Sequence, residues 1–434
     1  MPYPKRRNLQ RFVYLVEEYA NLKHEFGSSG MDDILQEVET QLKNSIEKMR
    51  RLPECADLAM KEPNGLEDIR ALRDKGPRRL WSRLKADEYK DRLEGAMLAR
   101  FAGCTLGAPV EFWSIQEMED WAGYIGFPFP PADYWPEIKA PNNLRYGVSP
   151  NEAYTSKKMD HVPVDDDITY TLLGLLIAEE FGLGFTVDDV GAAWLKYLPY
   201  ACTAEEAALA SLKRGAAPKE AADIDNPFCQ WIGADIRSDP WAYMCPAYPE
   251  KAASLAYHDA YISHRRNGIY GEMFFAAAQS AAFASESAEE ALKIGLTEIP
   301  SACSLHNDVL WALEEGKNIH DYRQARQAVD DHFSGMPQVH TNSNAALTIF
   351  GLLIGGSDVA KVLSQIVAMG MDNDCTAATA GSIIGAIVGK KGIPEHWYKP
   401  FNNKVKTYLI GHPVFDIDDV AARFMRLAEK AHEK

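Results

Sequence analysis

Apolar residues recur three and four positions apart along most of this 434-residue chain, the spacing of one face of an α-helix. Two such segments, residues 8–26 and 31–52, are separated by a break at residues 27–30 that contains two glycines. Further helices are predicted from residue 89 to Pro109, over 168–181, through most of 186–300, from about 340 to 356, over 376–389 and at the end of the chain. No stretch alternates apolar and polar residues over the length of a strand.

This pattern predicts an all-α fold. Residues 1–85 are interpreted as an N-terminal helical extension, whose charged residues are typical of solvated helix faces. Residues 86–434 are interpreted as one compact multi-helix domain. Neither a phosphate-binding P-loop nor a dinucleotide-binding glycine motif after a strand is present.

Residues 113–164 interrupt the helical pattern, because prolines and aromatic residues are interleaved there. Proline removes a backbone donor, so we predict a long ordered loop rather than a helix or a central strand. Loops of this length often act as lids or binding loops. Two interpretations are open: the aromatic side chains stack on a planar ring of a ligand, or they pin the loop to the core. A shorter irregular stretch, residues 226–250, interrupts the later helices.

Two acidic motifs each precede an apolar helix. Asp372 and Asp374 stand before the small and apolar run that starts at Thr376, and Asp165, Asp166 and Asp167 stand before residue 168. A helix N-terminus stabilises a carboxylate by about 1 kcal/mol, less than the several kcal/mol needed to dehydrate a buried ion. Hard divalent cations take carboxylate oxygens, so the two motifs together predict a site for one or two metal ions. The alternative is a tightly packed core whose acidic residues only cap helices.

Two of the predicted helices contain glycines at helical spacing. Gly381, Gly385 and Gly389 recur every fourth residue after the Asp372 motif, and the helix before Pro109 carries three more, Gly95, Gly103 and Gly107. A helical glycine costs about 1 kcal/mol relative to alanine. We therefore expect each of these helices to lie close to a neighbouring backbone.

Other candidate residues lie at breaks between helices. Glu111 lies two residues after Pro109, where a carboxylate serves as a cap unless a metal lies nearby. Arg237 is able to hold an anionic group or to form a structural ion pair. His264 stands at the break before a helix and is a candidate for orienting a substrate, although a lone histidine is often a satisfied core residue. The candidate substrate-binding residues are His264, Arg237, Asn267, Gly268 and Tyr270.

Composition narrows the classes of function. The formal net charge of −16 argues against a general affinity for nucleic acid or for anionic membranes. Seven cysteines are scattered without CxxC spacing, and neither a secretory signal nor a long apolar segment is evident. We therefore expect a cytoplasmic protein with reduced thiols.

Three motifs, in order along the chain, resemble those of the ADP-ribosylglycohydrolases, a family that includes the dinitrogenase reductase-activating glycohydrolase and the ADP-ribosyl-acceptor hydrolases. GCTLGAPVE, residues 103–111, is similar to the family's G-D-x-x-G-x-P-x-E, with Cys104 in place of Asp. DDDI, starting at Asp165, is similar to its T/S-D-D-T motif. GMDNDC, residues 370–375, followed by spaced glycines, is similar to its G-x-D-T-D-T motif. The resemblance covers about residues 93–397.

The resemblance implies an all-α domain around two divalent ions, Mg²⁺ or Mn²⁺, that hold ribose hydroxyls while a glycosidic bond at C1 is hydrolysed. The positions that match the family's metal ligands are Glu111, Asp165, Asp166, Asp167, Asp372, Asp374 and Cys375, with Thr376 as a substitute for Cys375. Cys375 stands where the family has a ligating Thr, and a thiolate is a soft ligand poorly suited to magnesium. His264 resembles a histidine that the family places beside the cleft. The acid or base is expected among Asp165, Asp166 and Glu111.

The leading hypothesis from the sequence is a metal-dependent glycohydrolase acting on an ADP-ribosylated or other ribosylated compound. One alternative is a hydrolase of a nucleoside-like small molecule, which the aromatic segment 113–164 would suit. The other is a non-enzymatic relative that keeps the fold for a structural or binding role, an alternative that the departures at Cys104 and Cys375 support.

Overall fold

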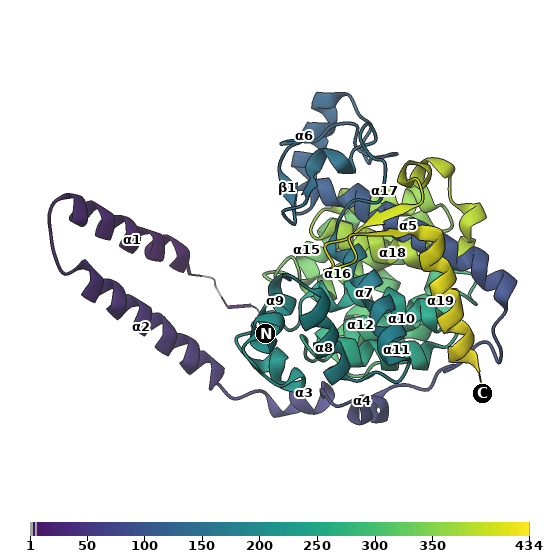
Figure 1. The fold of residues 1–434 in the computed structure, drawn as a ribbon, viewed down its shortest axis with the longest axis horizontal. Helices are drawn as coiled ribbons and strands as arrows, with labels where there is room; N and C mark the ends of the chain where they lie inside the picture. Colours follow the sequence, from purple (N-terminus) through teal and green to yellow (C-terminus); the bar gives the residue numbers. More distant parts are fainter. Residues whose placement is uncertain (1–2, 5–6, 434) are drawn as a thin grey trace. The chain divides into compact units, whose positions relative to one another are not determined.

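The computed structural model describes residues 3–4 and 7–433, and helices dominate it (Figure 1). Nineteen α-helices and four short strands are present in these residues. The prediction of a mostly helical fold is confirmed. Within the described residues, no helix combines the length and the apolar composition needed to cross a membrane. All seven cysteines are free thiols.

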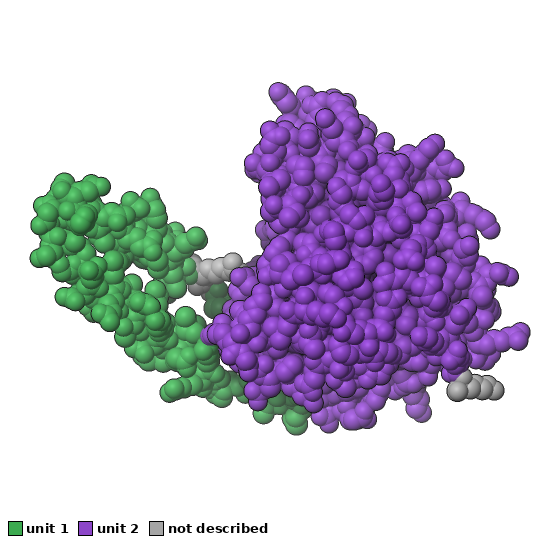
Figure 2. Space-filling model, viewed as in Figure 1, with its two compact units in different colours: residues 1–60 green, residues 61–434 purple. Residues whose placement is uncertain are grey.

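The chain divides into two compact units, residues 1–60 and 61–434, coloured separately in Figure 2. The first unit contains α1 (Leu9–Glu25) and α2 (Met31–Arg50), which confirm the first two predicted helices, and the start of α3 (Ala56–Lys61). No residue of α1 or α2 is buried, so this helical hairpin has no core of its own. The predicted boundary at residue 85 stays a prediction.

The second unit contains the remaining helices. They are α4 (Leu66–Leu72), α5 (Ala86–Gly107), α6 (Ile115–Ile125), α7 (Asp166–Phe181), α8 (Val187–Tyr197), α9 (Thr203–Lys213), α10 (Asp239–Met244), α11 (Pro249–Ala260), α12 (Asn267–Ala282), α13 (Ala288–Leu296), α14 (Ser304–Glu315), α15 (Tyr322–His332), α16 (Thr341–Gly355), α17 (Val359–Met369), α18 (Asn373–Val388) and α19 (Ile417–His432). Every residue of α12 is buried, including the polar residues Asn267, Glu272 and Gln279.

The strands form two short antiparallel hairpins. β1 (Leu144–Arg145) pairs with β2 (Ser149–Pro150), with Leu144 opposite Pro150. β3 (Lys404–Lys406) pairs with β4 (Val414–Asp416). Short 3₁₀ helices, including Ala108–Val110 after α5 and Ile232–Arg237 before α10, connect several of the α-helices.

The two glycine-spaced helices, α5 and α18, pack against each other and make the most extensive helix contact of the fold (Figure 1). A Cβ atom added at Gly103 would lie 2.2 Å from the carbonyl oxygen of Ala377, and one at Gly385 would lie 2.2 Å from that of Gly95. The two backbones approach so closely that no side chain fits between them at these points. The predicted close approach is therefore confirmed, and its partner is the other glycine-spaced helix.

The prediction of a loop throughout residues 113–164 is wrong at its beginning. α6 occupies residues 115–125, and Ser114 and Glu117 form a capping box at its start. The prolines that argued against a helix begin only at Pro128, beyond the end of α6. In the rest of the segment, Tyr134 and Trp135 are buried, which favours the interpretation that aromatic residues pin this part to the core.

Candidate functional site

Three chain segments bring their carboxylates to one place. Asp165 is the N-cap of α7, Asp372 is the N-cap of α18, and Glu111 follows the 3₁₀ helix at the end of α5. The α5–α18 packing explains why these ends meet. A Cβ atom at Gly107 would lie 2.5 Å from the Cα atom of Asp374, so the end of α5 is held directly against the start of α18. The same glycine contact that builds the core thus positions the site.

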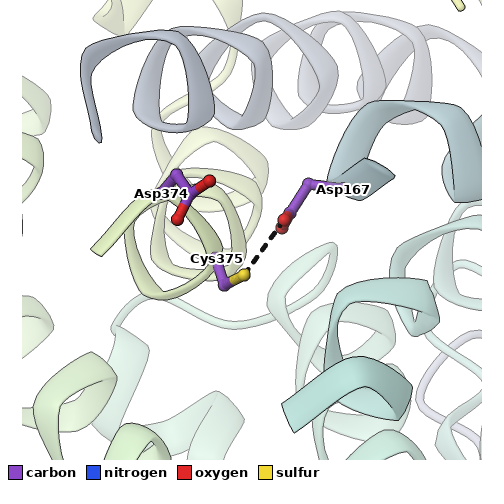
Figure 3. Close-up of side chains that lie close together, drawn as sticks. All are labelled: Asp167, Asp374 and Cys375. Carbon is purple, nitrogen blue, oxygen red and sulfur yellow. Dashed lines mark hydrogen bonds between the residues drawn. The ribbon is translucent and has the colours of Figure 1, made fainter. Parts of the chain in front are cut away.

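Three overlapping groups of side chains have ligand atoms within 4.8 Å of one another. The groups are Glu111, Asp372 and Asp374; Asp165, Asp166 and Asp167; and Asp167, Asp374 and Cys375. We call these seven residues the acidic cluster. Figure 3 shows the third group, in which the Cys375 thiol from α18 points toward Asp167 from α7 and donates a hydrogen bond to Asp167 Oδ2 over 3.1 Å. The structure therefore brings together both acidic motifs and Glu111, as the metal hypothesis requires.

The donor atoms of the acidic cluster fit a hard divalent cation. Asp167 Oδ1, Asp372 Oδ1 and Asp374 Oδ1 are buried and accept no hydrogen bond from any residue that the structure describes. An unpaired buried carboxylate oxygen is unfavourable, and a divalent ion at 2.0–2.6 Å is the partner that such oxygens prefer. The two predicted ligands that are not carboxylates differ in their position. Cys375 joins the cluster, whereas the Thr376 hydroxyl donates to the carbonyl of Asp372 over 3.0 Å.

Burial makes the charged forms of these groups unfavourable when no cation is bound. It raises the pKa of Asp372 and of Asp166 to about 7, with repulsion from Glu111 and Asp165, respectively, as the next cause. The pKa values of Asp167 and Asp374 rise well above the ordinary range for the same first reason. Burial also raises the pKa of the Cys375 thiol, so this side chain stays protonated near neutral pH and is a poor metal ligand.

We expect the metal-free protein to lose stability as the pH rises from about 4 to about 7. The folded protein keeps protons on Asp166 and Asp372 up to about pH 7, whereas the unfolded chain loses them near pH 4. The folded state therefore binds more protons across this window, and the free energy of unfolding falls as pH increases. Urea unfolding in chelator at pH 5 and at pH 8 measures this difference, and saturating Mg²⁺ should reduce it. Equal stability at both values would contradict the expectation.

Arg145, which the sequence analysis did not single out, lies inside the acidic cluster. Its guanidinium contacts Glu111 at 2.8 Å, Asp165 at 3.0 Å and Asp374 at 3.2 Å. The next residue, Tyr146, donates its hydroxyl to Asp166 Oδ1 over 2.7 Å. Arg145 is 34 residues from Glu111 and 229 from Asp374 along the chain, and nothing in its local sequence marks it as a site residue.

Arg100 supports the same region from within the core. It lies on α5, is fully buried, and donates to the carbonyl of Asp167 over 2.8 Å and to the hydroxyl of Thr171 over 3.0 Å. Its guanidinium is 3.2 Å from Asp239 and 3.7 Å from Asp167. A buried arginine with this many partners holds the first turn of α7 in place, and with it the second acidic motif.

A pocket of about 340 Å³ opens beside the acidic cluster. Its lining includes Glu111, Asp166, Asp372 and Cys375 from the cluster and Arg145 beside them. The aromatic side chains of the lining are Phe112, Tyr146, Tyr170 and Trp231. The pocket thus combines aromatic rings with the acidic groups, and Tyr146 is the part of the segment 113–164 that reaches it together with Arg145.

The backbone around the pocket is conformationally strained. Phe112, Tyr146 and Thr203, which line the pocket, have φ values of 60°, 51° and 47°, and Met371 beside Asp372 has a φ of 59°. Non-glycine residues rarely adopt the left-handed region; each costs about 1–3 kcal/mol and persists only where the surroundings impose it. The amide of Phe112 donates to the carbonyl of Met371 over 3.0 Å, which ties two of these positions together. Strain concentrated at one place is typical of functional sites.

Arg237 lies behind the pocket rather than in its lining. It is fully buried and forms ion pairs with Glu205 at 2.9 Å, Asp259 at 2.7 Å and Glu272 at 3.4 Å. Glu205 does line the pocket, and burial raises its pKa to about 7 despite the nearby guanidinium. Arg237 therefore has the surroundings of a structural ion pair, one of the two uses expected from the sequence.

The other predicted substrate-binding residues, like Arg237, do not line the pocket. His264 is buried and its pKa is well below the ordinary value because of burial, and its Nδ1 atom contacts the hydroxyl of Ser263 at 2.8 Å. Asn267 and Tyr270 bind residues that precede α4: Asn267 donates to Glu62 and Tyr270 to the carbonyl of Pro63. A Cβ atom at Gly268 would lie 2.4 Å from the carbonyl of Cys229. None of these four lines the pocket, and their predicted substrate contacts stay predictions.

The family to which the chain belongs follows from its match to a family model. The model of the ADP-ribosylglycohydrolase family matches residues 85–433.

The chain belongs to the ADP-ribosylglycohydrolase family.

No curated protein matches the sequence. A solved structure titled "ADP-ribosylglycohydrolase-related protein complex" matches with a TM-score of 0.50 and 20% sequence identity, covering 80% of this chain and 99% of the other. At this identity the likeness concerns the fold. The suspected family is thus confirmed, and membership in the ADP-ribosylglycohydrolases suggests ADP-ribosyl glycohydrolase activity of the largely metal-dependent kind.

Proposed function

We propose that this member of the ADP-ribosylglycohydrolase family is a metal-dependent enzyme that hydrolyses the C1 glycosidic bond of a ribosylated compound. The observation that carries the proposal is the shared pocket. Asp372 and Asp166 of the acidic cluster line the same 340 Å³ cavity as the rings of Trp231 and Tyr170. A ribose held at the carboxylates would thereby place an attached planar base against aromatic side chains.

The chain's own residues have separate tasks in this proposal. Asp167, Asp372 and Asp374, whose buried oxygens lack partners among the described residues, would hold Mg²⁺ or Mn²⁺. A divalent ion bound there supplies Lewis acidity, fixes the ribose diol and makes a bound water more acidic. Arg100 and the α5–α18 contact keep the acidic residues in register for it.

Glu111 and Asp166 are the proposed acid and base residues. Both line the pocket, and burial raises the pKa of each, so a proton is available on them nearer to neutral pH than on an ordinary carboxyl. Asp165 is less suited, because it is outside the pocket lining and both of its oxygens are occupied. Its Oδ1 atom accepts from the amide of Asp167 over 3.2 Å and its Oδ2 atom from Arg145. We assign Asp165 to holding the start of α7.

The charge of the pocket favours a second candidate substrate, an uncharged nucleoside-like riboside. Four carboxylates line the pocket, from Glu111, Asp166, Glu205 and Asp372. Arg145 is the one Lys or Arg side chain in that lining, and its guanidinium is already paired with three carboxylates. A diphosphate would find little positive charge beyond that of the bound metal.

The test is hydrolysis by the magnesium-loaded protein of two substrate sets, ADP-ribosylated peptides and a panel of purine and pyrimidine ribosides. Released ADP-ribose or ribose is quantified by chromatography, with chelator-treated protein as the control. Release from the peptides supports the ADP-ribosyl activity, and release from the ribosides alone supports the second candidate. Absence of metal-dependent release from every member of both sets would favour the non-enzymatic relative.

Trp231→Ala is expected to weaken binding of the hydrolysed substrate by about 10- to 100-fold, because stacking of a base on an aromatic ring contributes about 1–3 kcal/mol. The affinity for Mg²⁺ should not change, since Trp231 is not part of the acidic cluster. Trp121→Ala is the matched control, because Trp121 stacks on Tyr124 and does not line the pocket. Calorimetric titration measures both affinities, and an unchanged substrate affinity in the Trp231 variant would contradict the stacking role.

A further inference from the structure

Arg145 joins three carboxylates that come from three different parts of the chain. Its Nη1 atom donates to Glu111 Oε2 at 2.8 Å, and its Nη2 atom donates to Asp165 Oδ2 at 3.0 Å and to Asp374 Oδ2 at 3.2 Å. These acids lie after α5, at the start of α7 and at the start of α18. The guanidinium therefore stands where a cation bridging the three segments would stand.

Both terminal nitrogens of Arg145 have hydrogen-bond partners, so this position is a built feature of the fold. Its backbone belongs to β1, opposite Ser149 of β2. The Nη1 atom also donates to the carbonyl of Ala108 at 2.8 Å, and the guanidinium carbon lies 5.4 Å from the ring centre of Tyr146 and 5.7 Å from that of Tyr154. The side chain is only 16% exposed. An arginine fixed by ion pairs, a carbonyl and two aromatic rings is a rigid cation.

The carboxylate oxygens of the acidic cluster include one set that binds Arg145 and a second set that is buried without a hydrogen bond. Each of Glu111, Asp165 and Asp374 gives one oxygen to the guanidinium. The fully buried oxygens of the cluster without a hydrogen bond from the described residues are Asp167 Oδ1, Asp372 Oδ1 and Asp374 Oδ1. A divalent ion that shared the first set of oxygens would stand next to a positive charge in a buried setting, which like-charge repulsion disfavours. In the second set, Asp167 and Asp372 make no ion pair with Arg145, and the guanidinium of Arg100 lies 3.7 Å from Asp167 Oδ1, farther than Arg145 lies from the oxygens of the first set.

We propose that the guanidinium of Arg145 is the resident cation in one half of the acidic cluster, so that the protein binds one divalent ion instead of two. This inference rests on the proposed metal site and concerns the number of ions. Arg145 pairs with one oxygen each of Glu111, Asp165 and Asp374, the last being Oδ2. The single ion binds at the oxygens of Asp167, Asp372 and Asp374 that remain free of hydrogen bonds. Cys375 accords with this division, because its thiol donates to Asp167 Oδ2 and sulfur is a soft ligand that adds no hard donor for a second ion.

The test is a calorimetric titration of the chelator-treated full chain with Mn²⁺, together with the electron paramagnetic resonance spectrum of the bound ion. We expect one ion per chain and the spectrum of an isolated Mn²⁺. Arg145→Ala removes the resident charge and frees three oxygens, so we expect two ions per chain and a spin-coupled pair. Arg145→Lys keeps the charge, and we expect it to retain one ion.

The outcomes separate this inference from the proposed function. Two ions in the wild-type protein overturn the role of Arg145 and leave the glycohydrolase proposal standing, whereas no bound ion in the wild-type protein contradicts both. One ion in both the wild-type protein and Arg145→Ala also overturns the role of Arg145, because removal of its charge would then not have created a site for a second ion. If Arg145→Ala fails to fold, the ion count and the spectrum of the wild-type protein decide by themselves.

Discussion

Asp374→Ala is expected to lower the affinity for Mg²⁺ by at least about 100-fold and to abolish metal-dependent hydrolysis, with the fold preserved. Asp374 belongs to two of the three groups of candidate ligands, one with Glu111 and Asp372 and one with Asp167 and Cys375. Loss of a residue that merely supports a ligand costs about 10- to 100-fold in metal affinity, so loss of a shared ligand should cost at least as much.

The fold should survive this change because Asp374 is an unfavourable residue in the metal-free state. Burial and the neighbouring Glu111 both raise its pKa, which shows that its charged form is destabilised there. Asp188→Ala is the matched control, since Asp188 occupies the first turn of α8 with an exposed side chain. Calorimetry gives the metal affinity and urea unfolding in chelator gives the stability. A variant that binds Mg²⁺ as tightly as the wild-type protein would refute the assignment of Asp374.

Gly103→Val should lower the free energy of unfolding by at least about 3 kcal/mol, the upper range for overpacking a core. The new Cβ atom would lie 2.2 Å from the carbonyl oxygen of Ala377 and 2.5 Å from its carbonyl carbon. These are backbone atoms of α18, so no side-chain rotation relieves the clash, and α5 and α18 must separate. Separation would also move Glu111 away from Asp374, because the end of α5 carries Glu111 to the site.

Gly123→Val provides the comparison for this second prediction. Gly123 is also a helical glycine, in α6, but a Cβ atom there meets nothing within 4 Å. We expect its stability to stay within about 0.5 kcal/mol of the wild-type value, as for surface substitutions away from packed features. Urea unfolding of both variants in the presence and absence of Mg²⁺ measures the difference. Equal effects at the two positions would show that the helical glycine contact contributes little to stability.

Local sequence was sufficient for the helices and for the two acidic motifs. The sequence places Asp372 and Asp374 before an apolar helix, and they are the N-cap and a first-turn residue of α18. This succeeded because helix starts and apolar periodicity are properties of consecutive residues. The composition of residues 113–164 does not predict the helix at 115–125, because the prolines that dominate the segment begin at Pro128, after the end of α6.

The sequence by itself determined the helical class, the presence of closely approaching glycine helices and the acidic ends that compose the site. The tertiary structure alone decided that α5 packs on α18, that Arg145 enters the acidic cluster, and that Arg237 and His264 stay behind the pocket. The physical reason is the range of the interactions. Capping and periodicity act within one or two helical turns, whereas a guanidinium that joins Glu111, Asp165 and Asp374 reaches across 229 residues of chain. Only the folded backbone brings such partners within 3.2 Å.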